Sequence, residues 1–518
     1  MRALSTSAVL SSIVLSGWLT GVTAQNVNVD AGNALSSVPD EQATGTEDEP
    51  VGVIPQPSID SPGMVLGATL GELYTDNLKL AASGKPKQTS WITEIQPFFK
   101  GAWNGPRFSG VLDYTMTGYL YAGQSRSNQL AHDLKAHGTF IILPQHFFLD
   151  GTALYGREVI NNELPAGSGT FFLNNNRANV ARGTISPYWV QDLGNVGTML
   201  LRYTLGRVIY NHHGISGQNA GLLNGIPDIT SKALQFSVVS PAYQTWGWNL
   251  AYSDQRIEPD FGRGIEYAVA KLGTSWQIND NTKLLADVGK ENRFLLDGTS
   301  RKLGASFWDV GFDWSNTRDN LKLLVGHRFY GRSYQFSWMR TAALLTTAMS
   351  YMEQPTDLNQ QLLGQDPGAI VTSPAGISYI PSLRNHQTYL MKRATASASY
   401  TMPRGSLRLV LYDERRTYFL LDNREERVAN ANIDWLFDIG ASTTLTSTFG
   451  WQRYQFQDGQ IIYNRYTQLA LVHQVNPNNF GSLRLRSDSR NVQSGAPGTP
   501  GAHGYRVNVL FLQWTHLF

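Results

Sequence analysis

The sequence predicts an all-β protein: a single closed antiparallel β-barrel that spans a membrane with about 20 strands. Three observations predict this fold. Stretches of alternating polar and apolar residues recur along residues 63–518, the turns between them alternate between short and long, and the chain ends in an amphipathic strand. Strand boundaries are the least exact part of such a prediction, so counts from about 16 to 22 agree with the pattern.

The N-terminal residues predict export from the cytoplasm. Arg2 precedes an apolar stretch at residues 8–19, and Val22-Thr23-Ala24 offers a small-residue cleavage site, so residues 1–24 have the form of a secretory signal peptide. Residues 25–62 contain seven acidic residues, five prolines and no Lys or Arg, which predicts a disordered acidic periplasmic linker. Residues 63–518 then carry 41 basic and 33 acidic residues, a net charge of about +8.

Residues 63–518 form the predicted barrel domain. The chain contains no Cys, which excludes a disulfide scaffold and a lipid-modified N-terminal Cys. No run after the signal peptide approaches the length of about 18 apolar residues that a membrane helix needs. If the protein enters a membrane, it therefore does so with strands.

The alternation has a period of two residues. In "WGWNLAYSD" (246–254), Trp246, Trp248, Leu250 and Tyr252 share one face, and "LGASFWDVGFDW" (303–314) repeats the pattern. Short connections occur at 104–106, 143–146, 191–196, 241–244, 278–281, 315–320, 402–405, 438–442 and 476–479, and longer ones at 157–178, 211–230, 339–386 and 491–504. Short turns at one end and long loops at the other are typical of outer-membrane barrels, whereas a soluble sandwich or a propeller explains the alternation alone.

The last residues, "LFLQWTHLF" (510–518), fit this interpretation. Leu510, Leu512, Trp514, His516 and Phe518 occupy every second position, and the terminal residue is aromatic. The segment resembles the C-terminal assembly signal of bacterial outer-membrane barrels, which the barrel-assembly machinery reads. It predicts a strand that faces lipid and pairs with the first strand, in the outer membrane of a Gram-negative bacterium.

If the apolar residues face lipid, their neighbours face the lumen. The cations on the inward register are Lys100, Lys135, Arg202, Lys322, Arg328, Arg408, Arg484 and Arg486, and the anions are Glu94, Asp113, Asp133, Asp150, Asp287, Asp309 and Asp313. These charges either pair across strands and stiffen a water-filled wall, or form a conduit that favours anionic solutes. Arg328, Tyr330 and Arg332 are expected to form a ladder on one wall that binds carboxylates or phosphates. The loop 339–386, in which 341–354 resembles a short helix, is expected to act as a plug or as an outer cap.

No enzymatic activity is expected. His212, His213 and Asp228, or His132 beside Asp133, do not have a spacing that demands catalysis or a metal site, so no metal and no cofactor are predicted. The basic residues form no clustered patch, which argues against nucleic-acid binding. Lipopolysaccharide is a more natural partner for the predicted loop arginines Arg424, Arg427, Arg490 and Arg506.

Several longer stretches resemble one family. "GATLGELYTDNLKLAASG" (67–84), "WITEIQPFFKG" (91–101), "LDYTMTGYLYAG" (112–123) and "GHRFYGRSYQFSWMRTA" (326–342) resemble the outer-membrane β-barrels associated with PEP-CTERM/exosortase systems. The resemblance covers roughly residues 64–518 and implies a pore or accessory component for the export of exopolysaccharide or another surface polymer. Anionic polysaccharide and periplasmic export proteins are then the expected partners, beside membrane lipid.

Two other functions remain open. One is a structural or adhesive barrel that transports nothing and binds partners through its loops, and the other is a hydrolase at the rim. An open lumen favours the pore, and a lumen filled by side chains or by the loop 339–386 favours the non-transporting barrel. A close Ser/His or Asp/His cluster at the rim favours the hydrolase.

Overall fold

A computed structural model describes residues 63–174, 176–211, 226–241, 245–262, 264–292, 304–364, 381–383, 387–419, 424–493 and 501–518. The predicted signal peptide (1–24) and the acidic linker (25–62) lie outside the described residues.

The described residues form one closed barrel of 22 antiparallel strands. Each strand pairs with the next along the chain, and the last strand pairs with the first from Gly67 opposite Leu517 to Thr75 opposite Val509. The strands are β1 (Gly63–Thr75), β2 (Ser90–Asn104), β3 (Phe108–Tyr121), β4 (Gln129–Leu143), β5 (Phe147–Val159), β6 (Arg177–Asp192), β7 (Thr198–Asn211), β8 (Ile229–Val239), β9 (Trp246–Pro259), β10 (Ile265–Asn279), β11 (Thr282–Glu291), β12 (Ala305–Ser315), β13 (Asp319–Arg328), β14 (Gly331–Thr341), β15 (Leu345–Thr356), β16 (Tyr389–Met402), β17 (Gly405–Tyr418), β18 (Glu425–Gly440), β19 (Thr443–Gln455), β20 (Ile461–Asn476), β21 (Asn479–Gln493) and β22 (Tyr505–Leu517). Two short helices, η3 (Ser125–Ser127) and α3 (Leu358–Leu362), interrupt the strand pattern. The predicted fold class is confirmed.

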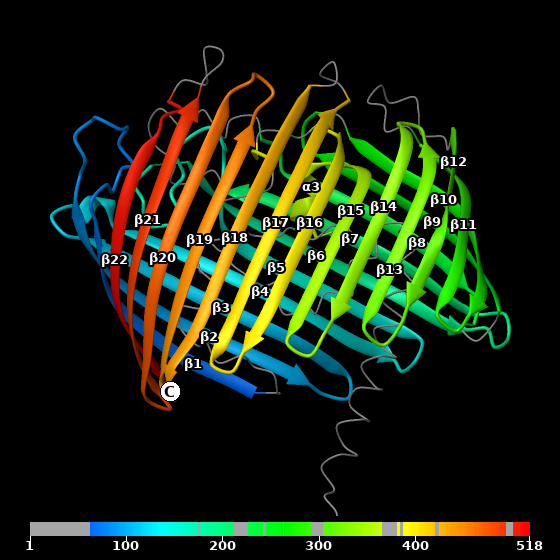
Figure 1. Ribbon diagram of the computed structural model, residues 1–518, viewed down its shortest axis with the longest axis horizontal. Coiled ribbons are helices and arrows are strands. Elements are labelled where there is room, and N and C mark those ends of the chain that lie inside the picture. The colour runs from blue at the N-terminus through cyan, green and yellow to red at the C-terminus, as the bar shows by residue number, and fades with distance from the viewer. Residues whose placement is uncertain are drawn as a thin grey trace, which may run out of the picture.

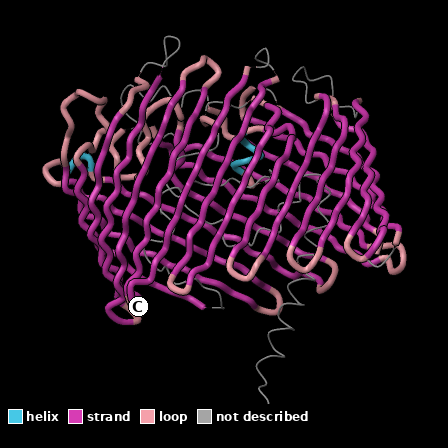
Figure 2. Tube along the Cα trace, in the orientation of Figure 1, coloured by secondary structure: helices cyan, strands magenta, loops and turns pink. Residues whose placement is uncertain are grey.

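The two ends of the barrel differ as predicted. Tight turns join the strands at the end where the C-terminus lies, at the bottom of Figure 1, and most of the longer connections lie at the opposite end (Figures 1 and 2). In outer-membrane barrels the short turns face the periplasm and the long loops face the outside. We therefore name these ends periplasmic and extracellular.

The strand count differs from 20 because the region 320–386 folds differently from its prediction. Residues 341–354 do not form a helix; most of them belong to β15, which pairs with β14 and β16. Two turns separate these strands, one at Phe329-Tyr330 and one at residues 342–344. The predicted loop 339–386 therefore shrinks to residues 357–388, of which 357–364, 381–383 and 387–388 are described.

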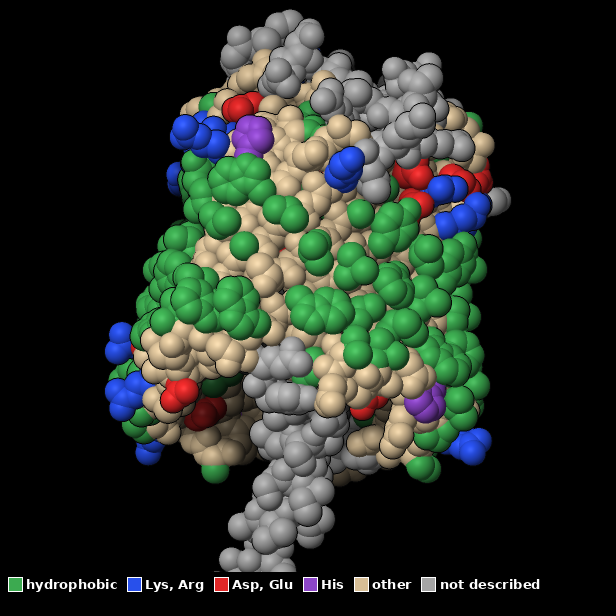
Figure 3. All heavy atoms as spheres, turned by 90° about the vertical axis from the view of Figure 1, so that its right-hand side faces the viewer, with side chains coloured by type: hydrophobic (Ala, Val, Ile, Leu, Met, Phe, Trp, Pro, Cys, Tyr) green, Lys and Arg blue, Asp and Glu red, His purple; other side chains and the backbone are tan. Residues whose placement is uncertain are grey.

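An apolar belt surrounds the barrel. Large hydrophobic side chains are exposed on the outward face of nearly every strand, and in Figure 3 they cover the middle of the molecule while most charged side chains lie above and below. A soluble protein does not expose such a continuous apolar surface, whereas a closed barrel in lipid requires it. The protein is an outer-membrane β-barrel. No helix among the described residues is long and apolar enough to cross a membrane.

The terminal strand takes the predicted orientation. Leu512 and Trp514 are 60% and 46% exposed on the outward face of β22, and Phe518 is 73% exposed beyond its end. The intervening Phe511 and Thr515 are buried on the inward face. The face that carries the predicted assembly signal is therefore the face that meets lipid.

Candidate functional site

Two segments from the extracellular end fold into the barrel and meet there. One follows β5 and comprises residues 160–176, of which residue 175 is not described. The other follows β15 and contains α3, which lies inside the barrel behind the front strands in Figure 1. We call them the first and the second inner loop. Loops normally run over the surface because their polar backbone needs hydrogen-bond partners, so an inward loop must find these partners inside.

The second inner loop is fastened at Asp357. This residue is the N-cap of α3, and its side chain accepts hydrogen bonds from the backbone amides of Asn359 (2.6 Å) and Gln360 (3.2 Å). The Tyr267 hydroxyl of β10 donates to the same carboxylate at 2.6 Å. Burial raises the pKa of Asp357, and the hydrogen bonds that it accepts oppose this increase.

Apolar contacts hold α3 against the wall formed by β6–β10. Leu358, Leu362, Leu363 and Leu383 of the second inner loop are buried in one cluster with inward side chains of these strands. Gly206 of β7 makes room for the approach, since a Cβ added there would lie only 3.1 Å from a methyl carbon of Leu363. The second inner loop thus crosses the lumen from β15 to the strands on the other side.

The first inner loop crosses the lumen in another direction. Phe171 and Phe172 are buried among inward side chains of β1, β2, β3 and β22. The Tyr121 hydroxyl donates to the backbone oxygen of Phe171 at 2.6 Å, and Ser168 forms a short hydrogen bond with Asp488 of β21. The Arg490 guanidinium of β21 donates to the carbonyl oxygen of Asn162 at 3.1 Å.

The two inner loops also contact each other. The Leu383 amide donates to the Ile160 carbonyl at 3.0 Å, and the Asn162 amide donates to Ser382 Oγ at 3.1 Å. Together the loops form a partition across the extracellular half of the lumen. Of the two alternatives left open for the loop 339–386, an inward plug and an outer cap, the described part that follows β15 favours the inward fold. The first inner loop is an addition that the sequence did not reveal.

The wall on the periplasmic side of this partition is polar and more open to water. Many of its inward side chains are only half-buried, and ion pairs cross neighbouring strands, such as Lys100–Asp113 at 3.1 Å and Arg202–Asp150 at 2.9 Å. A hollow opens at the lower end of Figure 3 beside acidic side chains. The interior therefore has a polar periplasmic vestibule and an extracellular half that the two inner loops enter.

A buried charge network stiffens the wall beside the partition. Glu414 of β17, fully buried, accepts hydrogen bonds from Arg393 (2.7 Å) and Arg416 (2.5 Å) and a short one from Tyr412. Arg416 also lies 3.5 Å from Glu426. Such groups are tolerated inside a protein only when they are paired, so the network orders this wall.

The predicted ladder of Arg328, Tyr330 and Arg332 is wrong. Arg328 ends β13 and points inward, whereas Arg332 lies on β14, opposite His327, and is exposed on the outward face. The turn at Phe329-Tyr330 reverses the chain between them, so the two guanidinium groups do not share a wall. Arg328 instead pairs with Glu291 (3.0 Å) and Asp309 (3.1 Å), and the Tyr330 hydroxyl donates to the Glu353 carbonyl.

The other predicted lumen cations do lie on the inward register. These are Lys100, Lys135, Arg202, Lys322, Arg408, Arg484 and Arg486. Arg202 and Arg486 pair with carboxylates, and the Arg484 guanidinium stacks 3.8 Å from the centre of the Phe511 ring. For the ion pairs described here, the structure bears out the interpretation that inward charges pair across or along strands. Whether any of these residues contacts a transported molecule stays a prediction.

Arg490 was expected to lie in a loop facing lipopolysaccharide, and this is wrong. It belongs to β21, points inward and is 7% exposed. The sequence pattern did not identify Arg490, Asp357 or Glu414 as residues of the interior. If the strand before residue 491 is extended to include Arg490, this residue falls on the same face as Arg484 and Arg486. No sequence signal places Asp357 against Tyr267.

Among the described residues, no group of three or more His, Asp or Glu side chains is arranged to hold a metal ion.

Comparisons with known proteins give a limited result. No family model matches the chain, and no curated protein matches it in sequence. Solved structures with a similar chain path include the FrpB iron transporter of Neisseria meningitidis, with 10% identity and a TM-score of 0.49, and the siderophore receptor PirA of Acinetobacter baumannii, with 7% identity and a TM-score of 0.47. Each match covers 89% of this chain and 81% of the other. At these scores the likeness carries no argument about what this protein transports.

Proposed function

We propose that this protein is a gated outer-membrane pore, in which the two inner loops form a gate on the extracellular side of a polar vestibule. The observation that carries the proposal is that the segments inside the lumen are loops and not part of the strand wall. Two loops from the extracellular end fold into the lumen and contact each other, while the strand wall beneath them is polar and charged. A closure made of loops can move without disturbing the hydrogen bonds of the barrel.

The molecule that passes the pore is part of the proposal. The resemblance noted in the sequence implies a surface polymer such as an exopolysaccharide, exported in a PEP-CTERM/exosortase-type system. The inward arginines of β21, on the wall that the first inner loop contacts, support an anionic polymer.

The second candidate is a barrel that transports nothing. The partition that crosses the lumen favours it, because a permanently filled interior serves only to support the loops. The two candidates differ in whether the loops separate.

A disulfide staple tests the gate. The chain contains no Cys, so the double variant Asn162→Cys/Ser382→Cys forms one defined cross-link between the inner loops. Single-channel recordings in planar bilayers should show closed channels when the staple is oxidised and openings after reduction. Replacing residues 358–386 by a Gly-Ser linker should produce long-lived openings.

The matched control is Thr152→Cys/Thr184→Cys, which joins two paired strands in the lumen whose hydroxyls lie 2.7 Å apart. Its conductance should not depend on the redox state. If the barrel with the loop replacement stays silent, the pore is rejected in favour of the non-transporting barrel. If the stapled barrel conducts equally when oxidised and reduced, the loops are not the gate.

A further inference from the structure

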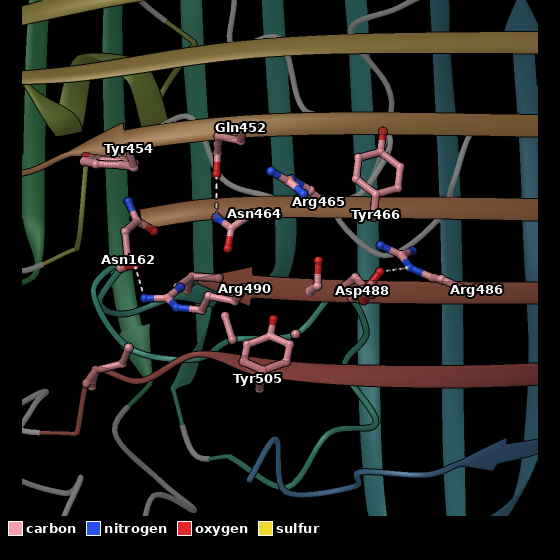
Figure 4. A pocket seen from close by; sticks show the side chains of 16 residues that line it. Asn162, Gln452, Tyr454, Asn464, Arg465, Tyr466, Arg486, Asp488, Arg490 and Tyr505 are labelled. Atoms are coloured by element: carbon pink, nitrogen blue, oxygen red, sulfur yellow. Dashed lines mark hydrogen bonds and ion pairs between the residues drawn. The ribbon is translucent and has the colours of Figure 1, made fainter. Parts of the chain in front are cut away.

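A small cavity lies where the first inner loop meets the strand wall of β19–β22. Its volume is about 50 Å³, and its lining includes Asn162 and Ser168 of the loop and Tyr454, Asp488, Arg490 and Tyr505 of the strands (Figure 4). One water molecule needs about 10–15 Å³ on such a measure, so the cavity holds a few waters or one group the size of a carboxylate or a phosphate.

Arg490 brings a buried positive charge to this cavity. Its terminal nitrogen donates to the carbonyl oxygens of Asn162 and Glu163. Its Nε has no hydrogen-bond partner and is buried too deeply for a water molecule to reach it. A buried guanidinium is costly unless its charge is compensated, and an anionic group in the cavity would compensate it.

The charges at the cavity favour an anion. Asp488 is already engaged, since Arg486 Nε donates to it at 2.8 Å and Ser168 bonds its other oxygen. Among the described residues, no carboxylate lies within ion-pair distance of Arg490, although the Glu163 carboxylate acts on it from farther away. Carbonyl dipoles alone thus contact the guanidinium, and these compensate a positive charge only in part.

The remaining lining suits a polar organic group. Gln452 and Asn464 present amides that are linked by a 2.9 Å hydrogen bond, and the Tyr454 and Tyr505 rings close two sides (Figure 4). Amides donate to the oxygens of an anion, and tyrosine rings pack against the faces of sugars.

We propose that this cavity binds one anionic group, a carboxylate or a phosphate, of a molecule that enters the lumen, with the buried guanidinium of Arg490 as its cation. This inference rests on the proposed function, because the ligand reaches the cavity through the lumen. It adds the class of molecule that the gated pore would carry, one with an anionic group. Carboxylates occur on acidic sugars and phosphates on phosphorylated polymers; both offer the same acceptor chemistry to a guanidinium.

Isothermal titration calorimetry of the full chain in detergent micelles tests the site, with sodium glucuronate and sodium phosphate as separate probes. We expect saturable binding of at least one probe and at least tenfold weaker binding for Arg490→Gln. The stronger probe identifies the source of the anion. The matched control is Arg506→Gln, which removes the same charge from the exposed face of the next strand and should leave binding unchanged.

A second variant guards against misfolding as the cause of lost binding. Asp488→Asn removes the negative charge beside the cavity and should strengthen binding severalfold, an outcome that unfolding cannot produce. Absence of saturable binding to both probes, or equal binding by wild type and Arg490→Gln, overturns the proposal. Calorimetry requires no conductance, so failure of the site and failure of the gate are recognised separately.

Discussion

Asp357 holds the second inner loop through one fully buried carboxylate. It receives bonds from the amides of Asn359 and Gln360 and from the hydroxyl of Tyr267, which joins the loop to β10. The neighbouring side chains of Leu358, Leu362 and Tyr267, which are buried together, carry no charge. The protonation state of this carboxylate therefore affects how strongly the loop docks.

The second inner loop should dock more tightly against the strand wall at acidic pH. Because burial raises the pKa of Asp357 above the value of about 3.9 that it has in water, the docked state binds the proton more strongly than the undocked state. The docking free energy is thus most favourable below about pH 3.9 and weakens as the pH rises through the raised pKa.

Single-channel open probability should therefore increase with pH across that window. Asp357→Asn, which cannot ionise, should abolish the dependence, and Asp228→Asn at the extracellular rim serves as a control that should keep it. A variant Asp357→Asn with the wild-type pH profile would contradict this assignment.

Glu414 should contribute much more to stability than an exposed acid on the same strand. Glu414→Gln removes the carboxylate charge that pairs with the buried guanidiniums of Arg393 and Arg416, and breaking such a pair costs about 3–5 kcal/mol. Asp413→Asn removes an exposed pair with Arg427, worth about 0–1 kcal/mol. Urea unfolding in lipid vesicles measures both free energies of unfolding, and similar costs would show that burial does not control them.

At the scale of elements, β15 and the second inner loop have separate roles. Replacing residues 358–386 by a short linker removes α3 but leaves Thr356 and Tyr389 paired at the ends of β15 and β16. Deleting residues 345–380 removes β15 itself and exposes the edges of β14 and β16. The first variant should keep the heat-modifiable gel mobility of a folded barrel and the second should lose it. Equal behaviour of the two variants would contradict the strand assignment.

One missed turn explains most of what the sequence did not predict. The reversal at Phe329-Tyr330 uses two aromatic residues, where hairpin turns usually carry Gly, Asn or Asp. Gly331, with φ of +114°, is the one turn-type residue beside them. Without that turn, residues 320–338 form a single strand, Arg328 and Arg332 share a face, and the following hairpin becomes a long loop.

The position of the two inner loops could not be predicted from the sequence, for a different reason. Strand alternation and turn length are local signals, and they predicted the barrel, its orientation and the outward face of β22. The inner loops depend on contacts between residues far apart in the chain, such as Ser168 with Asp488 and Asn162 with Ser382. Local patterns carry no information about such pairs.

For the whole molecule, lipid contact fixes which face of each strand tolerates charge. Leu485, in the middle of β21, and Val475, at the periplasmic end of β20, are about equally exposed, at 50% and 52%. An arginine on the lipid face costs about 2–4 kcal/mol at the centre of the bilayer and about 0–1 kcal/mol near its edge.

Leu485→Arg should therefore lower the free energy of unfolding by several times as much as Val475→Arg. Unfolding by denaturant in lipid vesicles measures both variants. Equal losses would mean that the belt does not lie across the centre of the bilayer.

The seam between β1 and β22 also has a kinetic consequence. Thr69 and Thr515 share a hydrogen bond of 2.8 Å although 446 positions separate them in the chain. A pairing of such high contact order forms late, because the ends of a very long loop must meet. Until the final strand arrives, every folding intermediate keeps two open edges that can aggregate or be degraded. The ring therefore cannot close before β22 is in place, and a chain that lacks this strand keeps both edges open.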